Sequence, residues 1–124
     1  MRKIKFGVIG CGHIGKRHAN MVLLNSECEL IALSDTADKE TLGLEDIDVP
    51  FYSSAAEMLA NEPSIDVVCI CTPNGLHVEQ GSLCLDYDKH VVLEKPMGLS
   101  RANCEELIFK ALNVSKHIFC VMQN

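Results

Sequence analysis

Three glycines are spaced like a loop that holds the phosphates of a dinucleotide: Gly10, Gly12 and Gly15, in a G-x-G-x-x-G pattern. An apolar, β-prone run over residues 4–9 precedes this loop, and a helical pattern over residues 13–25 follows it. In that order, the first glycine permits a tight turn out of the strand and the second lets the backbone approach a pyrophosphate, while the third lets the helix pack on the strand. We therefore expect the backbone N–H groups of His13 and Ile14 to face a pyrophosphate at the positive end of the helix.

A carboxylate supplies the next element of such a site. Asp35 lies twenty residues beyond Gly15 and ends a second apolar run, over residues 29–34. An acidic residue in this place accepts hydrogen bonds from the adenosine ribose and repels a 2′-phosphate, and neither Thr36 nor Ala37 is an arginine that would bind one. We expect NAD as the cofactor rather than NADP, with Asp35 and Thr36 in contact with it. The alternative is that Asp35 caps a helix.

The composition indicates a globular protein and disfavours several classes of function. The 124 residues suit one domain, 48% of them are apolar and 23% are charged, and the net charge is −6. This acidic balance and an aromatic content of only 5% disfavour a nucleic-acid partner. No apolar run reaches the roughly twenty residues of a membrane span, so we expect a cytoplasmic chain with no membrane partner.

The seven cysteines do not form a C-x-x-C pair, and no His or Cys cluster has the spacing of metal ligands. We therefore expect no metal site, and free thiols in a reducing compartment. Cys11 lies at the start of the first helix, where the pKa of a thiol falls. A redox role for Cys11 is the alternative to its being a small residue that fills the loop.

Strand-like apolar runs alternate with helical patterns along the chain. We expect strands over residues 4–9, 29–34, 50–52, 65–71, 90–93 and 118–122. We expect helices over residues 13–25, 55–61, 76–87 and 100–113, and a short, weak helix over residues 36–49. The first helix, as the spacing predicts, presents these residues on one face: Ile14, His18, Met21, Val22 and roughly Asn25. The alternation predicts an α/β fold, a doubly wound parallel sheet of about six strands with helices on both faces, in one dinucleotide-binding domain over residues 1–124.

Two further motifs follow predicted strands and belong at the same edge of the sheet as the glycine loop: Cys71-Thr72-Pro73-Asn74-Gly75-Leu76-His77 and Glu94-Lys95-Pro96. With the glycine loop, they resemble the NAD(P)-dependent glucose–fructose oxidoreductase and inositol dehydrogenase family. The resemblance covers essentially the whole chain. It implies an oxidoreductase that transfers hydride between nicotinamide and a hydroxyl-bearing carbon of a sugar, a cyclitol or a sugar nucleotide.

The resemblance also implies roles for single residues of the first motif. Thr72, Pro73 and Asn74 would line the floor beneath the ribose and pyrophosphate of the cofactor. His77 would approach the nicotinamide ribose or the substrate. The alternative for His77 is a residue in the first turn of a helix that makes no contact.

The second motif carries the chemistry that the resemblance implies. Lys95 would be the catalytic residue, because its ammonium group would hydrogen-bond the substrate hydroxyl and stabilise the developing alkoxide. Glu94 would hold the nicotinamide ribose or pair with Lys95. The resemblance further implies a cis peptide bond between Lys95 and Pro96.

The length of the chain departs from the family pattern. Family members continue past the sixth strand into a second domain, which shapes the substrate pocket, supplies a catalytic histidine and usually forms the oligomer interface. We expect this chain to be the cofactor-binding half of such an enzyme, whose complete form is a homo-oligomer that acts on a small molecule. The alternative is a stand-alone NAD-sensing module, which has no need of Glu94-Lys95-Pro96 beside the nicotinamide.

Overall fold

A computed structural model describes residues 2–94 and 101–121 of the chain. Its strands form one parallel six-stranded sheet in the order β3-β2-β1-β4-β5-β6. The strands are β1 (Ile4–Ile9), β2 (Cys28–Ser34), β3 (Phe51–Tyr52), β4 (Val67–Ile70), β5 (His90–Glu94) and β6 (Ile118–Val121). The helices are α1 (His13–Leu24), α2 (Ala55–Asn61), α3 (His77–Asp86) and α4 (Arg101–Asn113), with a 3-10 turn, η1 (Asn74–Leu76), before α3. The predicted doubly wound α/β fold is confirmed.

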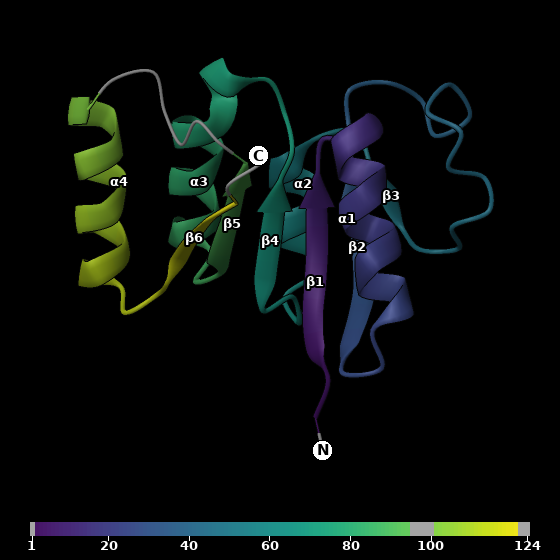
Figure 1. Ribbon diagram of the computed structural model, residues 1–124, viewed down its shortest axis with the longest axis horizontal. Coiled ribbons are helices and arrows are strands. Elements are labelled where there is room, and N and C mark those ends of the chain that lie inside the picture. Colours follow the sequence, from purple (N-terminus) through teal and green to yellow (C-terminus); the bar gives the residue numbers. More distant parts are fainter. Residues whose placement is uncertain (1, 95–100, 122–124) are drawn as a thin grey trace.

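Helices cover both faces of the sheet (Figure 1). The core on one face includes Met58 from α2, Cys84 from α3 and Leu107 from α4. The core on the other face includes Ala19 and Val22 from α1. Because the central strands are buried on both faces, they stand out in the sequence as continuous apolar runs. Across the part of the chain that the structure describes, no helix has both the length and the apolar character needed to cross a bilayer.

The buried face of α1 differs from the predicted one. Gly15, Ala19 and Val22 are the buried residues of this helix, whereas the Met21 side chain is 66% exposed. Gly15 lies so close to the end of β1 that an added Cβ would stand 1.9 Å from the carbonyl oxygen of Gly10. Small residues therefore set the approach of α1 to the sheet. The predicted face is confirmed for Val22, which is buried, and wrong for Met21.

The prediction of a weak helix over residues 36–49 is also wrong, because this segment forms turns. Gly43 has a φ of +70°, and its N–H donates to the carbonyl of Glu40, while the N–H of Leu44 donates to that of Lys39. A left-handed residue of this kind ends a helical turn. Leu44 is then buried against the α1 face of the sheet, so hydrophobic contact holds the segment in place of helical hydrogen bonds.

Candidate functional site

The predicted site residues that the structure describes lie at the carboxyl edge of the sheet, where β1 lies between β2 and β4. From β1 the strand order runs outward through β2 to β3 on one side and through β4 to β6 on the other. Open α/β sheets bind ligands at the carboxyl ends of the strands where the order reverses in this way. A cavity of about 370 Å³ opens here. Its lining combines predicted residues with unpredicted ones: Gly10, Gly12, Asp35, Thr36, Thr72 and Pro73, together with Ser34, Ser53, Ser54 and Gln80.

The three glycines of the loop differ in their surroundings. Gly10 has a φ of +86°, and an added Cβ would lie 2.8 Å from the backbone nitrogen of Thr72, so this turn needs a glycine. Gly15 lies against the backbone of Gly10, whereas nothing lies within 4 Å of an added Cβ at Gly12. The predicted turn and the predicted helix packing are thus confirmed. Contact of Gly12 with a pyrophosphate stays a prediction, and the open space beside it fits one.

The first turn of α1 is free to receive an anion. Its N-cap, Gly12, makes no side-chain capping bond, and no acidic residue lies in the first turn. The first intrahelical bond runs from the N–H of Lys16 to the carbonyl of Gly12, so the N–H groups of His13, Ile14 and Gly15 have no acceptor within the helix. These donors and the helix dipole suit a phosphate group.

Asp35, which follows β2, is hydrogen-bonded to the glycine loop that follows β1. One carboxylate oxygen accepts the N–H of Cys11 at 2.7 Å, and the other accepts the N–H of Ala37 at 2.9 Å. No helix follows Asp35, so the alternative of a helix cap is wrong. A carboxylate has about four lone-pair positions. Asp35 is half-buried, and it therefore keeps acceptor capacity for ribose hydroxyls while it anchors the glycine loop.

His77 lies beneath the loop that follows β4. Its side chain is only 1% exposed, and its Nε2 lies 2.7 Å from the carbonyl oxygen of Thr72. The hydroxyl of Thr72 also bonds the side-chain oxygen of Gln80 in α3. The alternative of a contact-free helix residue is therefore wrong. Approach of His77 to a nicotinamide ribose or a substrate stays a prediction.

Ser34 is a site residue that sequence reasoning missed. Its hydroxyl is buried, lines the cavity and has no hydrogen-bond partner within the described residues. A buried polar group in this state is costly unless a ligand or water satisfies it. Its position directly before Asp35 is the one sequence feature that could indicate a role for Ser34 in the site. A serine at the end of a strand belongs to no known binding motif, so the sequence did not predict this role.

The prediction that Cys11 fills the loop is confirmed, and the alternative of a redox role, which needs a lowered thiol pKa, is wrong. Burial and then the nearby charge of Asp35 raise the pKa of the Cys11 thiol to about 12. The thiol donates to the carbonyl of Ser34 at 3.4 Å, and the residue is 1% exposed. Burial and a neighbouring carboxylate thus outweigh the helix dipole, and Cys11 fills space in the loop.

We expect Cys11 to resist alkylation in the folded chain. A few minutes with iodoacetamide at pH 8 should modify the exposed Cys120 and leave Cys11 intact, because a thiol with a pKa of about 12 holds little thiolate and is shielded from solvent. Peptide mass spectrometry measures the extent of alkylation of Cys11 and of Cys120 in the same sample. Labelling of Cys11 as fast as Cys120 would contradict the prediction, and labelling in urea is the control.

The segment with the predicted catalytic lysine, Glu94-Lys95-Pro96, is only partly within the described residues. Glu94 ends β5 at the same edge as the glycine loop. Lys95, Pro96 and the bond between them lie outside the described residues, so their predicted roles, and those of Glu94 and Asn74, stay predictions. Within residues 2–94 and 101–121, no three His, Cys, Asp or Glu side chains are grouped to hold a metal ion.

Comparison with known proteins identifies the family of this chain. The family model described as "Oxidoreductase family, NAD-binding Rossmann fold" matches residues 4–121. Myo-inositol 2-dehydrogenase of Thermotoga maritima is 32% identical over 85% of the chain and 32% of its own length. Scyllo-inositol 2-dehydrogenase (NADP(+)) of Bacillus subtilis is 30% identical over 84% of the chain and 29% of its own length.

Solved structures agree with these relatives. The WlbA dehydrogenase of Chromobacterium violaceum, in complex with NADH and UDP-GlcNAcA, matches with a TM-score of 0.89 and 32% identity, over 98% of this chain and 35% of that one. The chain spans about a third of the length of these relatives. The fold, the glycine loop and the family match together place the chain in this oxidoreductase family, as an NAD-binding Rossmann domain.

Proposed function

We propose that this domain prefers NAD to NADP and forms the cofactor-binding half of a dehydrogenase that acts on a hydroxyl group of a sugar, a cyclitol or a sugar nucleotide. The observation that carries the proposal is the open space beside Gly12 at the uncapped start of α1, with Asp35 anchored at the neighbouring strand end. The loop donors suit the pyrophosphate, and the carboxylate suits the adenosine ribose.

The cofactor preference depends on the charge at the end of β2. The carboxylate of Asp35 faces the cavity edge beside Thr36, where a 2′-phosphate would bring a second negative charge close to it. The Bacillus relative, whose name specifies NADP(+), makes this preference worth testing in this chain.

We expect the 124-residue chain to bind NAD about tenfold more tightly than NADP in calorimetric titration. Asp35→Ala should bring the two affinities within about twofold, since the repulsion leaves with the carboxylate. The ratio of the two dissociation constants is informative even if the variant folds less completely, because an unfolded fraction weakens the apparent binding of both cofactors by the same factor. Tighter binding of NADP to the unaltered chain would contradict the preference.

Asp38→Ala is the matched control for this change. Asp38 is exposed and lies three residues beyond Asp35, and the same charge is removed there without loss of a bond to the glycine loop. We expect this variant to keep the preference of the unaltered chain. A similar narrowing in both variants would assign the preference to net charge and not to the Asp35 site.

The proposed chemistry is the removal or return of a substrate hydroxyl proton as hydride moves between carbon and nicotinamide. When bound, the cofactor supplies the hydride acceptor or donor. The motif after β5 would supply charge stabilisation, because the ammonium group of Lys95 would donate a hydrogen bond to the substrate oxygen and stabilise its negative charge. The hydroxyl proton would pass to a base of the proposed second domain, for which the family resemblance implies a histidine. The names of the inositol dehydrogenases and the UDP-GlcNAcA complex support the substrate class.

Catalysis also needs a substrate held in attack geometry with water excluded. We expect the 124-residue chain to bind NAD but to give no steady NADH absorbance with a panel of sugars, cyclitols and sugar nucleotides, because the wall of the pocket opposite the cofactor belongs to the proposed second domain. Steady turnover by this chain that disappears in Lys95→Ala would show that one domain suffices, and would overturn the division into two halves.

A further inference from the structure

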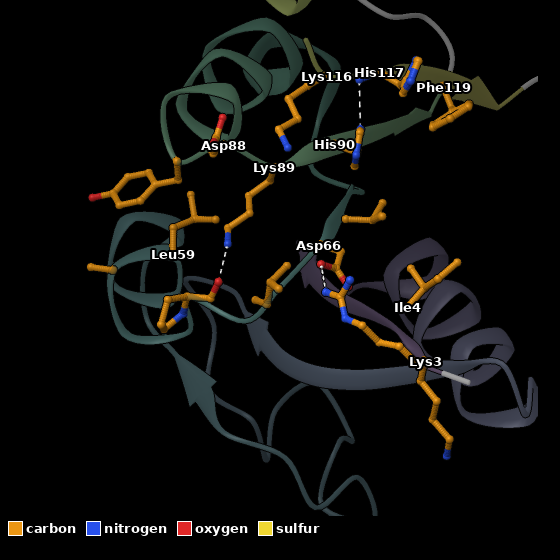
Figure 2. A pocket seen from close by; sticks show the side chains of 16 residues that line it. Lys3, Ile4, Leu59, Asp66, Asp88, Lys89, His90, Lys116, His117 and Phe119 are labelled. Carbon is orange, nitrogen blue, oxygen red and sulfur yellow. Dashed lines mark hydrogen bonds and ion pairs between the residues drawn. The ribbon is translucent and has the colours of Figure 1, made fainter. Parts of the chain in front are cut away.

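A second cavity lies at the opposite, amino edge of the sheet, where no role has been assigned so far (Figure 2). Its volume is about 770 Å³, about twice that of the cavity beside Asp35. Most of the residues that line it come from the starts of β1, β4, β5 and β6 and from the turns before them, and Leu59 and Ala60 come from α2. The cavity is thus separated from the dinucleotide site by the length of the strands.

The lining of this cavity is basic although the chain is acidic. Four basic and two acidic side chains line it, a balance of +2 in a chain of net charge −6: Arg2, Lys3, Lys89 and Lys116, with Asp66 and Asp88. The carboxylate of Asp66 is already engaged, since it accepts from Arg2 at 2.6 Å and from the N–H of Lys5 at 2.9 Å. The wall before β5 and β6 carries Lys89 and Lys116 with one acidic residue, Asp88, so it keeps a positive balance.

Lys89 is the only Lys, Arg, Asp or Glu buried in the part of the chain that the structure describes, with 5% exposure. Its Nζ donates one hydrogen bond, of 2.9 Å, to the carbonyl of Pro63, and an ammonium group has three donors. Burial lowers the pKa of Lys89, the charges of Asp66 and Asp88 oppose this, and the charge of Lys116 adds to it. A buried cation beside a second cation is stabilised when an anion joins them.

His90 adds a neutral donor to the same wall. Its Nδ1 accepts the N–H of His117 at 3.0 Å, so the neutral ring carries its proton on Nε2. The rings of His90 and His117 stack at 5.3 Å, and Phe119 lies 6.0 Å from His117. Figure 2 shows His90 next to Lys116, with His117 and Phe119 on the side away from Lys89 and with Leu59 and Ile4 on other walls. The cavity therefore offers cations for one end of a ligand and flat apolar surfaces for its body.

We propose that this cavity binds a small organic anion, with its carboxylate or phosphate group between Lys89, Lys116 and His90 and an aromatic or apolar body against the rings. The wall combines charge-assisted donors with partial burial, which favours an anion over a neutral molecule of the same shape. The site is independent of the dinucleotide site, so failure of either proposal leaves the other in place.

Benzoate and benzamide are the probes, because they share a ring and differ in charge. We expect benzoate, titrated into the ¹⁵N-labelled 124-residue chain, to shift the amide resonances of His90, Lys116 and His117 saturably and to leave that of Gly12 unchanged. Benzamide should bind at least about fivefold more weakly. Inorganic phosphate should shift the same resonances with lower affinity, because it lacks the ring.

Lys116→Gln should raise the dissociation constant of benzoate about fivefold, because the half-exposed lysine contributes a charge-assisted contact without supporting the core. Arg101→Gln is the matched control, since it removes an equal charge from a side chain that is 93% exposed on α4, and it should leave benzoate binding unchanged. Both variants should bind NAD as the unaltered chain does. Equal binding of benzamide and benzoate, unchanged binding in Lys116→Gln, or shifts confined to the glycine loop would each overturn the proposal.

Discussion

Replacing Gly15 by alanine is expected to destabilise the domain by about 3 kcal/mol. The added Cβ would stand 1.9 Å from the carbonyl oxygen of Gly10 and 2.8 Å from its carbonyl carbon, whereas ordinary contact begins at 3.4 Å. Both neighbours are backbone atoms, so no side-chain rotation relieves the clash. The start of α1 must instead move away from the sheet, which opens the packing around Ala19 and Val22.

Urea denaturation of Gly15→Ala, followed by circular dichroism, measures this loss. The transition midpoint should fall while its slope stays near that of the unaltered chain. NAD binding should weaken as well, because the same movement displaces the donors at the start of α1. A midpoint equal to that of the unaltered chain would show that α1 does not lie this close to β1, and the account of the glycine loop would be wrong.

Replacing Gly12 by alanine is expected to have the reverse pattern, with the fold retained and NAD binding reduced about a hundredfold. Nothing lies within 4 Å of the added Cβ, and Gly12 has a φ of −72°, which alanine adopts readily. Stability should stay the same or rise by a few tenths of a kcal/mol, because alanine restricts the unfolded chain. The new methyl group would occupy the space through which a pyrophosphate reaches the backbone N–H groups.

Calorimetric titration with NAD, paired with the same urea denaturation, tests Gly12→Ala. The two glycine variants serve as controls for each other, because each adds one methyl group within the same six-residue loop. A stable Gly12→Ala variant that binds NAD normally would place the pyrophosphate elsewhere. Loss of stability in that variant would mean that the space beside Gly12 is filled by the chain itself.

The architecture and the edge of the sheet that carries the glycine loop are both predictable from the sequence. Parallel strands buried on both faces leave continuous apolar runs, and β1, β2, β4 and β5 were all found from such runs. The spacing of Gly10, Gly12 and Gly15 after the first run, and of Asp35 after the second, follows from local turn geometry. These signals are readable because they depend on residues close together in the chain.

Contacts between side chains and backbone atoms that are far apart in the sequence are set only by the folded chain. Asp35 accepts the N–H of Cys11 across 24 residues of sequence. Burial and then the charge of Asp35 raise the pKa of the Cys11 thiol, although its place at a helix start would lower this pKa. The face that α1 buries also depends on its distance from β1, which favours Gly15 and Ala19 over the larger Met21.

The basic cavity at the amino edge of the sheet also depends on contacts between segments that are far apart in the sequence. Lys89 and Lys116 lie in different turns, and no spacing in the sequence relates them to each other or to Pro63. They meet because parallel strands begin together at one edge, which brings the turns before β5 and β6 side by side. Contacts of this kind depend on burial and distance between remote segments, and these are set only when the sheet has formed.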